Sequence, residues 1–175
     1  ADTAAALRWN AASVGLYRTE FAFDIRSSFP TEAEQTAVLE GIAERLHPRP
    51  IVFRLLDLGA DKTLEYFPLP EVVNPALGLR GTRLLLAHPE ILRTQLRAIV
   101  RASGYGPVRI LVPMISGAEE MRTVRNLLRE VLAEVRAQGH EIAAQVEVGA
   151  MIEVPAAALS LPGFIGDCDF LSIGT

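Results

Sequence analysis

The sequence lacks the features that mark secreted, membrane-spanning or nucleic-acid-binding proteins. Cys168 is the single cysteine among 175 residues, so no internal disulfide can form. No apolar run approaches the roughly 20 residues of a membrane-spanning helix, and the first residues do not resemble a signal peptide. Basic residues are scattered and the formal net charge is −4, which argues against nucleic acid as a partner. The composition therefore predicts a soluble protein of a reducing, cytoplasmic setting, with no membrane or nucleic-acid partner.

Short motifs for nucleotide and metal sites are also missing. The sequence has no Walker loop and no G-x-G-x-x-G pattern. His47, His88 and His140 show no metal-ligand spacing and lie where helices are expected to begin or end. Cys168 has no histidine near it in the sequence, which favours a buried structural thiol over a nucleophile.

What the sequence does contain is the pattern of one α/β domain. Half of the residues are hydrophobic and 22% are charged, which is typical of a globular chain long enough for one core. Five short apolar runs predict strands, at residues 14–18, 51–56, 108–113, 146–153 and 170–174. Helical patterns separate them, and this alternation favours a parallel sheet. A doubly wound sheet and a (β/α)8 barrel are both open at this point.

Helical spacing of apolar residues appears in four segments, at residues 3–12, 31–46, 89–103 and 116–138. Thr31 and Glu34 have the spacing of a capping box at the start of the second segment. Ser116 and Glu119 have the same spacing at the start of the fourth, and Gly139 is expected to end it. These signals predict where the two helices begin.

Charged residues stand at or near the ends of three predicted strands: Arg18, Arg54 and Glu153. In a parallel barrel, functional groups cluster at the carboxyl ends of strands. Arginine forks suit carboxylate and phosphate, and a carboxylate can hold a divalent cation beside such an anion. A surface ion pair is the alternative for Arg18. Arg54 could instead pair with Asp57 or Glu153, which would give Glu153 a structural role.

The segment at residues 57–77 is long, rich in glycine and proline, and poor in periodicity. Such a length in a compact domain favours a functional loop. Asp57, Asp61 and Lys62 form a possible polar cluster within it, although a surface loop explains the same residues.

Two further arginines, Arg80 and Arg83, follow this loop. Gly78 and Gly81 beside them would let the backbone approach a ligand closely. A plain turn with solvated charges is the alternative. The pattern thus adds Arg80 to the candidate anion-binding residues.

Six motifs in order resemble one known family. They are residues 15–21 (GLYRTEF), 54–62 (RLLDLGADK), 74–81 (NPALGLRG), 113–114 (PM), 149–157 (GAMIEVPAA) and 170–175 (FLSIGT). Together they resemble enzyme I of the phosphoenolpyruvate-dependent phosphotransferase system, and the resemblance covers nearly the whole chain. Tyr17 and the sequence of residues 152–155 resemble the nitrogen-related branch of that family more than its other branch.

This resemblance implies that residues 1–175 form a single incomplete domain: a partial (β/α)8 TIM barrel, with roughly strands 2 to 6 and their helices. Arg18, Arg54 and Arg80 would hold the phosphate and carboxylate of phosphoenolpyruvate, and Glu153 would be one of two acidic Mg²⁺ ligands. The phosphoryl group would pass to a histidine on a separate N-terminal domain, and then to a small phosphocarrier protein. A homodimer is also implied.

The chain departs from the family pattern in several places. In the family, the segment after Gly174 and Thr175 supplies the second acidic metal ligand, a further arginine and a proton-donating cysteine. Cys168 is not that cysteine, because it precedes the fifth strand. Ala60 replaces a family glycine. We therefore expect a fragment with no catalytic residue of its own, no turnover alone, and a tendency to self-associate.

Three alternative functions are compatible with part of this sequence pattern. A metal-dependent aldolase or lyase of the citrate-lyase β-subunit type resembles the chain only around residues 151–155 and the last strand. Pyruvate phosphate dikinase and phosphoenolpyruvate synthase share the substrate, but fit residues 15–21 less well. A docking module without turnover is the third.

Overall fold

A computed structural model describes residues 3–24, 27–59, 64–70 and 73–174, and in it five parallel strands curl into a half-barrel. The strands are β1 (Val14–Arg18), β2 (Ile51–Arg54), β3 (Val108–Val112), β4 (Glu147–Ile152) and β5 (Phe170–Ile173). Their spatial order is their order in the sequence, as in a barrel and unlike a doubly wound sheet. The predicted partial barrel is confirmed, with strands slightly shorter than expected.

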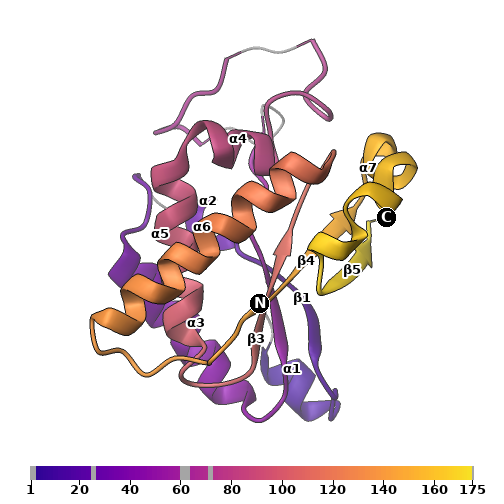
Figure 1. Ribbon diagram of the computed structural model, residues 1–175. Coiled ribbons are helices and arrows are strands. Elements are labelled where there is room, and N and C mark those ends of the chain that lie inside the picture. Colours follow the sequence, from indigo (N-terminus) through magenta and orange to yellow (C-terminus); the bar gives the residue numbers. More distant parts are fainter. Residues whose placement is uncertain (1–2, 25–26, 60–63, 71–72, 175) are drawn as a thin grey trace.

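Helices α3, α5 and α6 cover the outer, convex face of this sheet (Figure 1). The helices are α1 (Thr3–Arg8), α2 (Phe21–Asp24), α3 (Glu32–Leu46), α4 (Gly81–Ala87), α5 (Pro89–Ala102), α6 (Ala118–Ala137) and α7 (Pro155–Ser160). Two short 3₁₀ turns, Leu161–Gly163 and Ile165–Asp167, lead into β5. Sequence reasoning missed the short helices α2, α4 and α7.

Alternation along the strands divides the core into two parts. Ile51 and Phe53 of β2 point outward and pack against the helices in the main core. Val52 points the other way and packs with Leu111 and Met151 on the concave face. Both faces of the strands are thus apolar, which explains why they appear in the sequence as continuous apolar runs.

One of the two predicted helix caps is confirmed. The Thr31 hydroxyl accepts from the Glu34 N–H at 3.3 Å, and the Thr31 N–H donates to Glu34 Oε2 at 2.8 Å. The Ser116 cap is wrong, since α6 begins at Ala118 with Gly117 as its N-cap residue. The Ser116 N–H donates instead to Glu120 Oε2 at 2.6 Å, because the chain is still turning away from β3 at this point.

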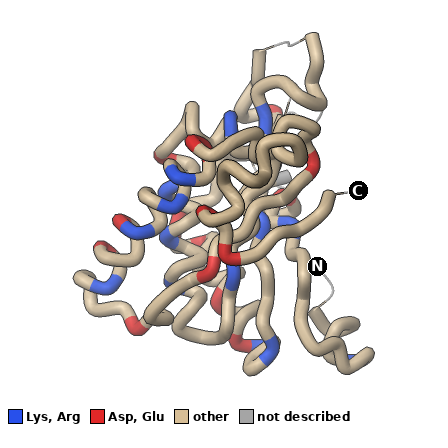
Figure 2. Tube along the Cα trace, turned by 45° about the vertical axis from the view of Figure 1, so that its right-hand side comes forward, with Lys and Arg blue, Asp and Glu red and all other residues tan. Residues whose placement is uncertain are grey.

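Ion pairs connect the outer helices at their surface, where positive and negative positions alternate (Figure 2). Arg97 of α5 donates to Glu32 of α3 at 2.7 Å and to Glu134 of α6 at 3.2 Å. The hydrogen bond to Glu32 is the main reason that the pKa of Arg97 is raised. Within the described ranges, no helix has both the length and the apolar character needed to cross a membrane.

Candidate anion-binding site at the carboxyl ends of the strands

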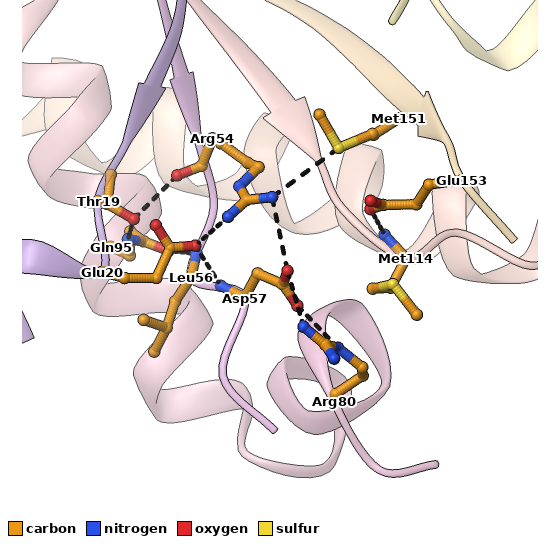
Figure 3. Close-up of polar contacts among 10 residues, drawn as sticks. All are labelled: Thr19, Glu20, Arg54, Leu56, Asp57, Arg80, Gln95, Met114, Met151 and Glu153. Atoms are coloured by element: carbon orange, nitrogen blue, oxygen red, sulfur yellow. Dashed lines mark hydrogen bonds and ion pairs between the residues drawn. The ribbon is translucent and has the colours of Figure 1, made fainter. Parts of the chain in front are cut away.

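Arg54 ends β2 and is buried at the carboxyl edge of the sheet (Figure 3). Its Nη2 donates to Glu20 Oε1 at 2.6 Å, and its Nη1 lies 3.5 Å from Asp57 Oδ2. The same Nη1 is 3.9 Å from the sulfur of Met151 on the concave face. Of the two partners considered from the sequence, the structure selects Asp57, and it adds Glu20 in place of Glu153.

Glu20 was not foreseen as a site residue, although it stands in the same polar run as Arg18. It is buried, and its Oε1 accepts both from Arg54 and from the Asp57 N–H, the latter at 3.1 Å. Its other oxygen, Oε2, is buried with no hydrogen-bond partner in the described part of the chain. Glu20 therefore fixes one edge of the Arg54 guanidinium and also the backbone at the start of the following loop.

A second buried contact ties β1, β2 and α5 together behind Arg54. The Thr19 hydroxyl donates to the Arg54 carbonyl at 2.9 Å, and Gln95 Nε2 donates to Thr19 Oγ1 at 3.0 Å. Gln95 Oε1 accepts the N–H of Leu56 at 2.8 Å. Gln95 is fully buried, so its amide holds the ends of two neighbouring strands in a fixed relation. A glutamine inside the apolar stripe of a helix was the sequence signal for this contact.

Arg80 immediately precedes α4 and reaches the same cluster. Its Nε and Nη2 donate to the two oxygens of Asp57 at 3.2 and 3.1 Å, a bidentate pair. Gly81 has a φ of +52°, and a Cβ there would lie 3.1 Å from Asp57 Oδ1. Glycine is therefore required beside Arg80. Arg83 does not join the cluster, because its Nη1 donates to the Leu77 carbonyl.

Glu153 follows β4 at the same edge of the sheet. Its Oε1 accepts the Met114 N–H at 2.8 Å, and the residue is half-buried. A Cβ on Gly174 would lie 2.5 Å from Glu153 Cβ, so the end of β5 passes directly beside it. Figure 3 shows Glu153 and Arg80 on the same side of the sheet as Arg54.

Arg18 ends β1 directly beside Arg54, its partner in the strand register. The side chain is exposed, and its Cζ lies 5.2 Å from the centroid of the Phe21 ring. The structure thus brings Arg18, Arg54, Arg80 and Glu153 to one edge, where Arg54 and Arg80 share Asp57.

Such an arrangement suits an anion with more than one acidic group. Guanidinium forks remain charged at all relevant pH values and pair with planar or tetrahedral oxyanions. Glu153 supplies a hard oxygen ligand of the kind that Mg²⁺ takes, usually one or two carboxylates with substrate phosphate and water. The residues present therefore fit a divalent cation, although no group of three His, Cys, Asp or Glu residues that could hold a metal occurs in the described ranges.

Other candidates lie elsewhere or cannot be placed. Cys168 precedes β5, at the opposite end of the sheet, and its Sγ lies 3.6 Å from the Phe164 carbonyl. Burial raises the pKa of this half-buried thiol, in keeping with a structural residue. Ala60, Asp61 and Lys62 lie outside the described residues.

Comparison with known proteins gives one consistent result. Residues 1–175 match the family described as PEP-utilising enzyme, PEP-binding domain, where PEP is phosphoenolpyruvate. The phosphoenolpyruvate-protein phosphotransferase of Listeria monocytogenes is 47% identical over 163 residues, which are 93% of this chain and 28% of that protein. Those of Geobacillus stearothermophilus and Latilactobacillus sakei are 44% and 41% identical over 174 residues, 99% of this chain and 30% of each protein. The chain thus spans less than a third of the length of these relatives.

Proposed function

Because this chain belongs, over its whole length, to the family of PEP-binding domains of PEP-utilising enzymes, we propose that it binds phosphoenolpyruvate at the carboxyl ends of its strands. The observation that carries the proposal is the pairing of Arg54 and Arg80 with the shared carboxylate of Asp57. Two arginines around one carboxylate are already arranged for an oxyanion. Arg18, next to Arg54 in the register, supplies a third, solvent-facing guanidinium.

In this proposal the arginines position the substrate and stabilise negative charge. Transfer of the phosphoryl group breaks the bond between phosphorus and the enol oxygen and leaves an enolate, which takes up a proton to give pyruvate. Charge therefore develops on the enol oxygen and on the transferring group, and fixed guanidinium groups stabilise both. Mg²⁺ held by Glu153 would neutralise further charge on the same oxygens.

The remaining parts of the reaction belong to the larger protein that the relatives' names indicate. We propose that the acceptor is a histidine on another domain, that a small phosphocarrier protein follows it, and that the protein works as a cytoplasmic homodimer. The sequence has only three histidines, and none belongs to the Arg54 cluster. The chain alone should therefore bind the substrate without turning it over.

Calorimetry with phosphoenolpyruvate in metal-free buffer tests the binding site. The Arg54→Ala variant should lose at least about tenfold in affinity, since a charge-assisted pair is removed. Arg109→Ala is the matched control, because Arg109 lies at the amino end of the sheet, one strand away from Arg54. Its affinity should stay within about twofold of the original chain. Equal affinity in the original chain and Arg54→Ala would refute the site.

The metal-dependent lyase considered from the sequence would need Glu153 and its cation but not the Arg80–Asp57 pair, and no contact among the described residues favours it. Pyruvate release from phosphoenolpyruvate by the chain without an acceptor protein would contradict the proposed division of labour.

A further inference from the structure

One peptide group connects the loop that carries Arg80 with the carboxylate of Glu153. The hydroxyl of Thr82 donates to the Pro113 carbonyl at 2.5 Å. The N–H of the next residue, Met114, donates to Glu153 Oε1 at 2.8 Å. Since the Pro113 carbonyl and the Met114 N–H belong to the same planar peptide group, turning this group would disturb both hydrogen bonds at once.

The backbone at this position has an unusual conformation. Met114 has a φ of 55°, in the left-handed region that residues with a side chain rarely occupy. Its side chain is buried against Gly81, where a Cβ would lie 2.8 Å from Met114 Cγ. Gly81 itself has a positive φ and stands between Arg80 and Thr82. Such backbone conformations persist only where the surrounding contacts determine them.

We propose that the Pro113–Met114 peptide group is a positioning element that sets Glu153 in register with Arg80. Thr82 is a positioning residue, because its hydroxyl acts on Glu153 through this peptide group. The inference rests on the proposed function, in which Arg80 binds the anion and Glu153 the cation. It goes beyond that function by assigning the coupling between the two ligands to Thr82, Pro113 and Met114.

Removing the Thr82 hydroxyl would leave the buried Pro113 carbonyl without its donor. A buried carbonyl without a partner is unfavourable, so the peptide group would turn toward another donor or water. The Met114 N–H would then leave Glu153, and the carboxylate would lose the orientation that suits a cation. The contacts of Arg54 with Glu20 and Asp57 involve none of these atoms, so metal-free anion binding should remain.

Thr82→Val removes the hydroxyl with little change in volume, and Thr82→Ser keeps it. Thr36→Val is the matched control, because the buried Thr36 hydroxyl has no hydrogen-bond partner in the described ranges.

Two measurements are made on each variant: hydrogen exchange of the Met114 amide by NMR, and calorimetry of phosphoenolpyruvate with and without Mg²⁺. In Thr82→Val we expect Met114 exchange to be about tenfold faster. With one acidic ligand we expect Mg²⁺ to tighten phosphoenolpyruvate binding only slightly, and in Thr82→Val this tightening should be lost while metal-free affinity stays within about twofold. Thr82→Ser and Thr36→Val should behave like the original chain.

Each outcome decides between the inference and a simpler role. Unchanged Met114 exchange in Thr82→Val would overturn the inference, whatever the ligands do. Equal losses of affinity with and without Mg²⁺ would also overturn it, because Thr82 would then act only on overall structure. If the original chain binds no phosphoenolpyruvate, the proposed function fails, and Met114 exchange still decides whether Thr82 positions this peptide group.

Discussion

Two arginine–glutamate pairs lie at opposite ends of the concave face, and they are alike in length but differ sharply in burial. At the carboxyl end, Arg54 and Glu20 are 2.6 Å apart with side-chain exposures of 9% and 8%. At the amino end, Arg109 and Glu147 are 2.5 Å apart with exposures of 43% and 50%. Arg109 also lies over the Phe170 ring, with its Cζ 5.7 Å from the ring centroid.

The difference in burial between the two pairs has consequences for the free energy of folding. An exposed pair such as Arg109–Glu147 is weakly stabilising and screened by salt. A buried pair is costly to desolvate and is often no better for stability than apolar residues. The carboxyl-end pair nevertheless has further fixed contacts, through Asp57 and the Thr19–Gln95 hydrogen bonds. A role in the proposed ligand site would explain why this pair is buried despite the free-energy cost of desolvating it.

The largest contrast should appear when each arginine is removed. Arg54→Ala leaves Glu20 buried without its counter-ion, so the free energy of unfolding should fall by about 3 kcal/mol or more. Chemical denaturation monitored by circular dichroism measures this change. A loss no greater than that of Arg109→Ala would show that the two pairs are energetically alike.

Removing the amide behind Arg54 should have the next largest effect. Gln95→Leu keeps the apolar volume but leaves the Leu56 N–H and the Thr19 hydroxyl without that partner, so we expect a loss of about 2 kcal/mol. The affinity for phosphoenolpyruvate should fall too, since the strand ends are no longer held together. A destabilised variant with full affinity would restrict Gln95 to a folding role.

Neutralising Glu20 without changing its shape separates charge from position. Glu20→Gln keeps an oxygen to accept from Arg54, so stability should fall by only about 1 kcal/mol. Loss of one negative charge beside Arg54 should tighten metal-free binding of phosphoenolpyruvate a few-fold at low salt. Calorimetry at two salt concentrations measures the effect. Weaker binding would mean that the Glu20 charge itself is needed to orient Arg54.

The smallest effect belongs to the exposed pair. Arg109→Ala should change the free energy of unfolding by no more than about 0.5 kcal/mol, and the change should vanish in high salt. Denaturation curves in low and high salt give this value. A large, salt-independent loss would mean that contact with Phe170, rather than charge, stabilises the concave face.

Local sequence patterns predicted most of the fold, because parallel strands buried on both faces are continuous apolar runs. Helix starts were less certain: the capping box at Thr31 is confirmed, whereas Ser116 lies where the chain still turns after Met114. Short α4 was missed because Gly81 at its first position suggests a turn. Its φ is +52°, and the room for a side chain there is taken by Asp57 and Met114, which are distant in sequence.

At the candidate site, sequence spacing selected the charged residues at strand ends but not how they pair. Asp57 was one of two expected partners for Arg54, while Glu20 lies in the turn after β1, and its contact with Arg54 depends on the register of β1 against β2. Gln95 and Thr82 are polar residues in helices. Gln95 contacts Leu56, which lies 39 positions away in the sequence, and Thr82 contacts Pro113, which lies 31 positions away. Such pairings are tertiary properties, so a single sequence shows the residues and not the contacts.

The bidentate pairing of Arg80 with Asp57 affects which anions the proposed site would accept. Asp57 already offers two oxygens in the geometry that a guanidinium fork prefers. Chloride offers a single point of charge and no second oxygen, so it gains less from Arg80 than Asp57 does. An anion with two or three oxygens on one centre can match that geometry and add charge. In the proposed site, the Asp57 carboxylate would therefore compete with weakly matched anions and disfavour the abundant monovalent halide.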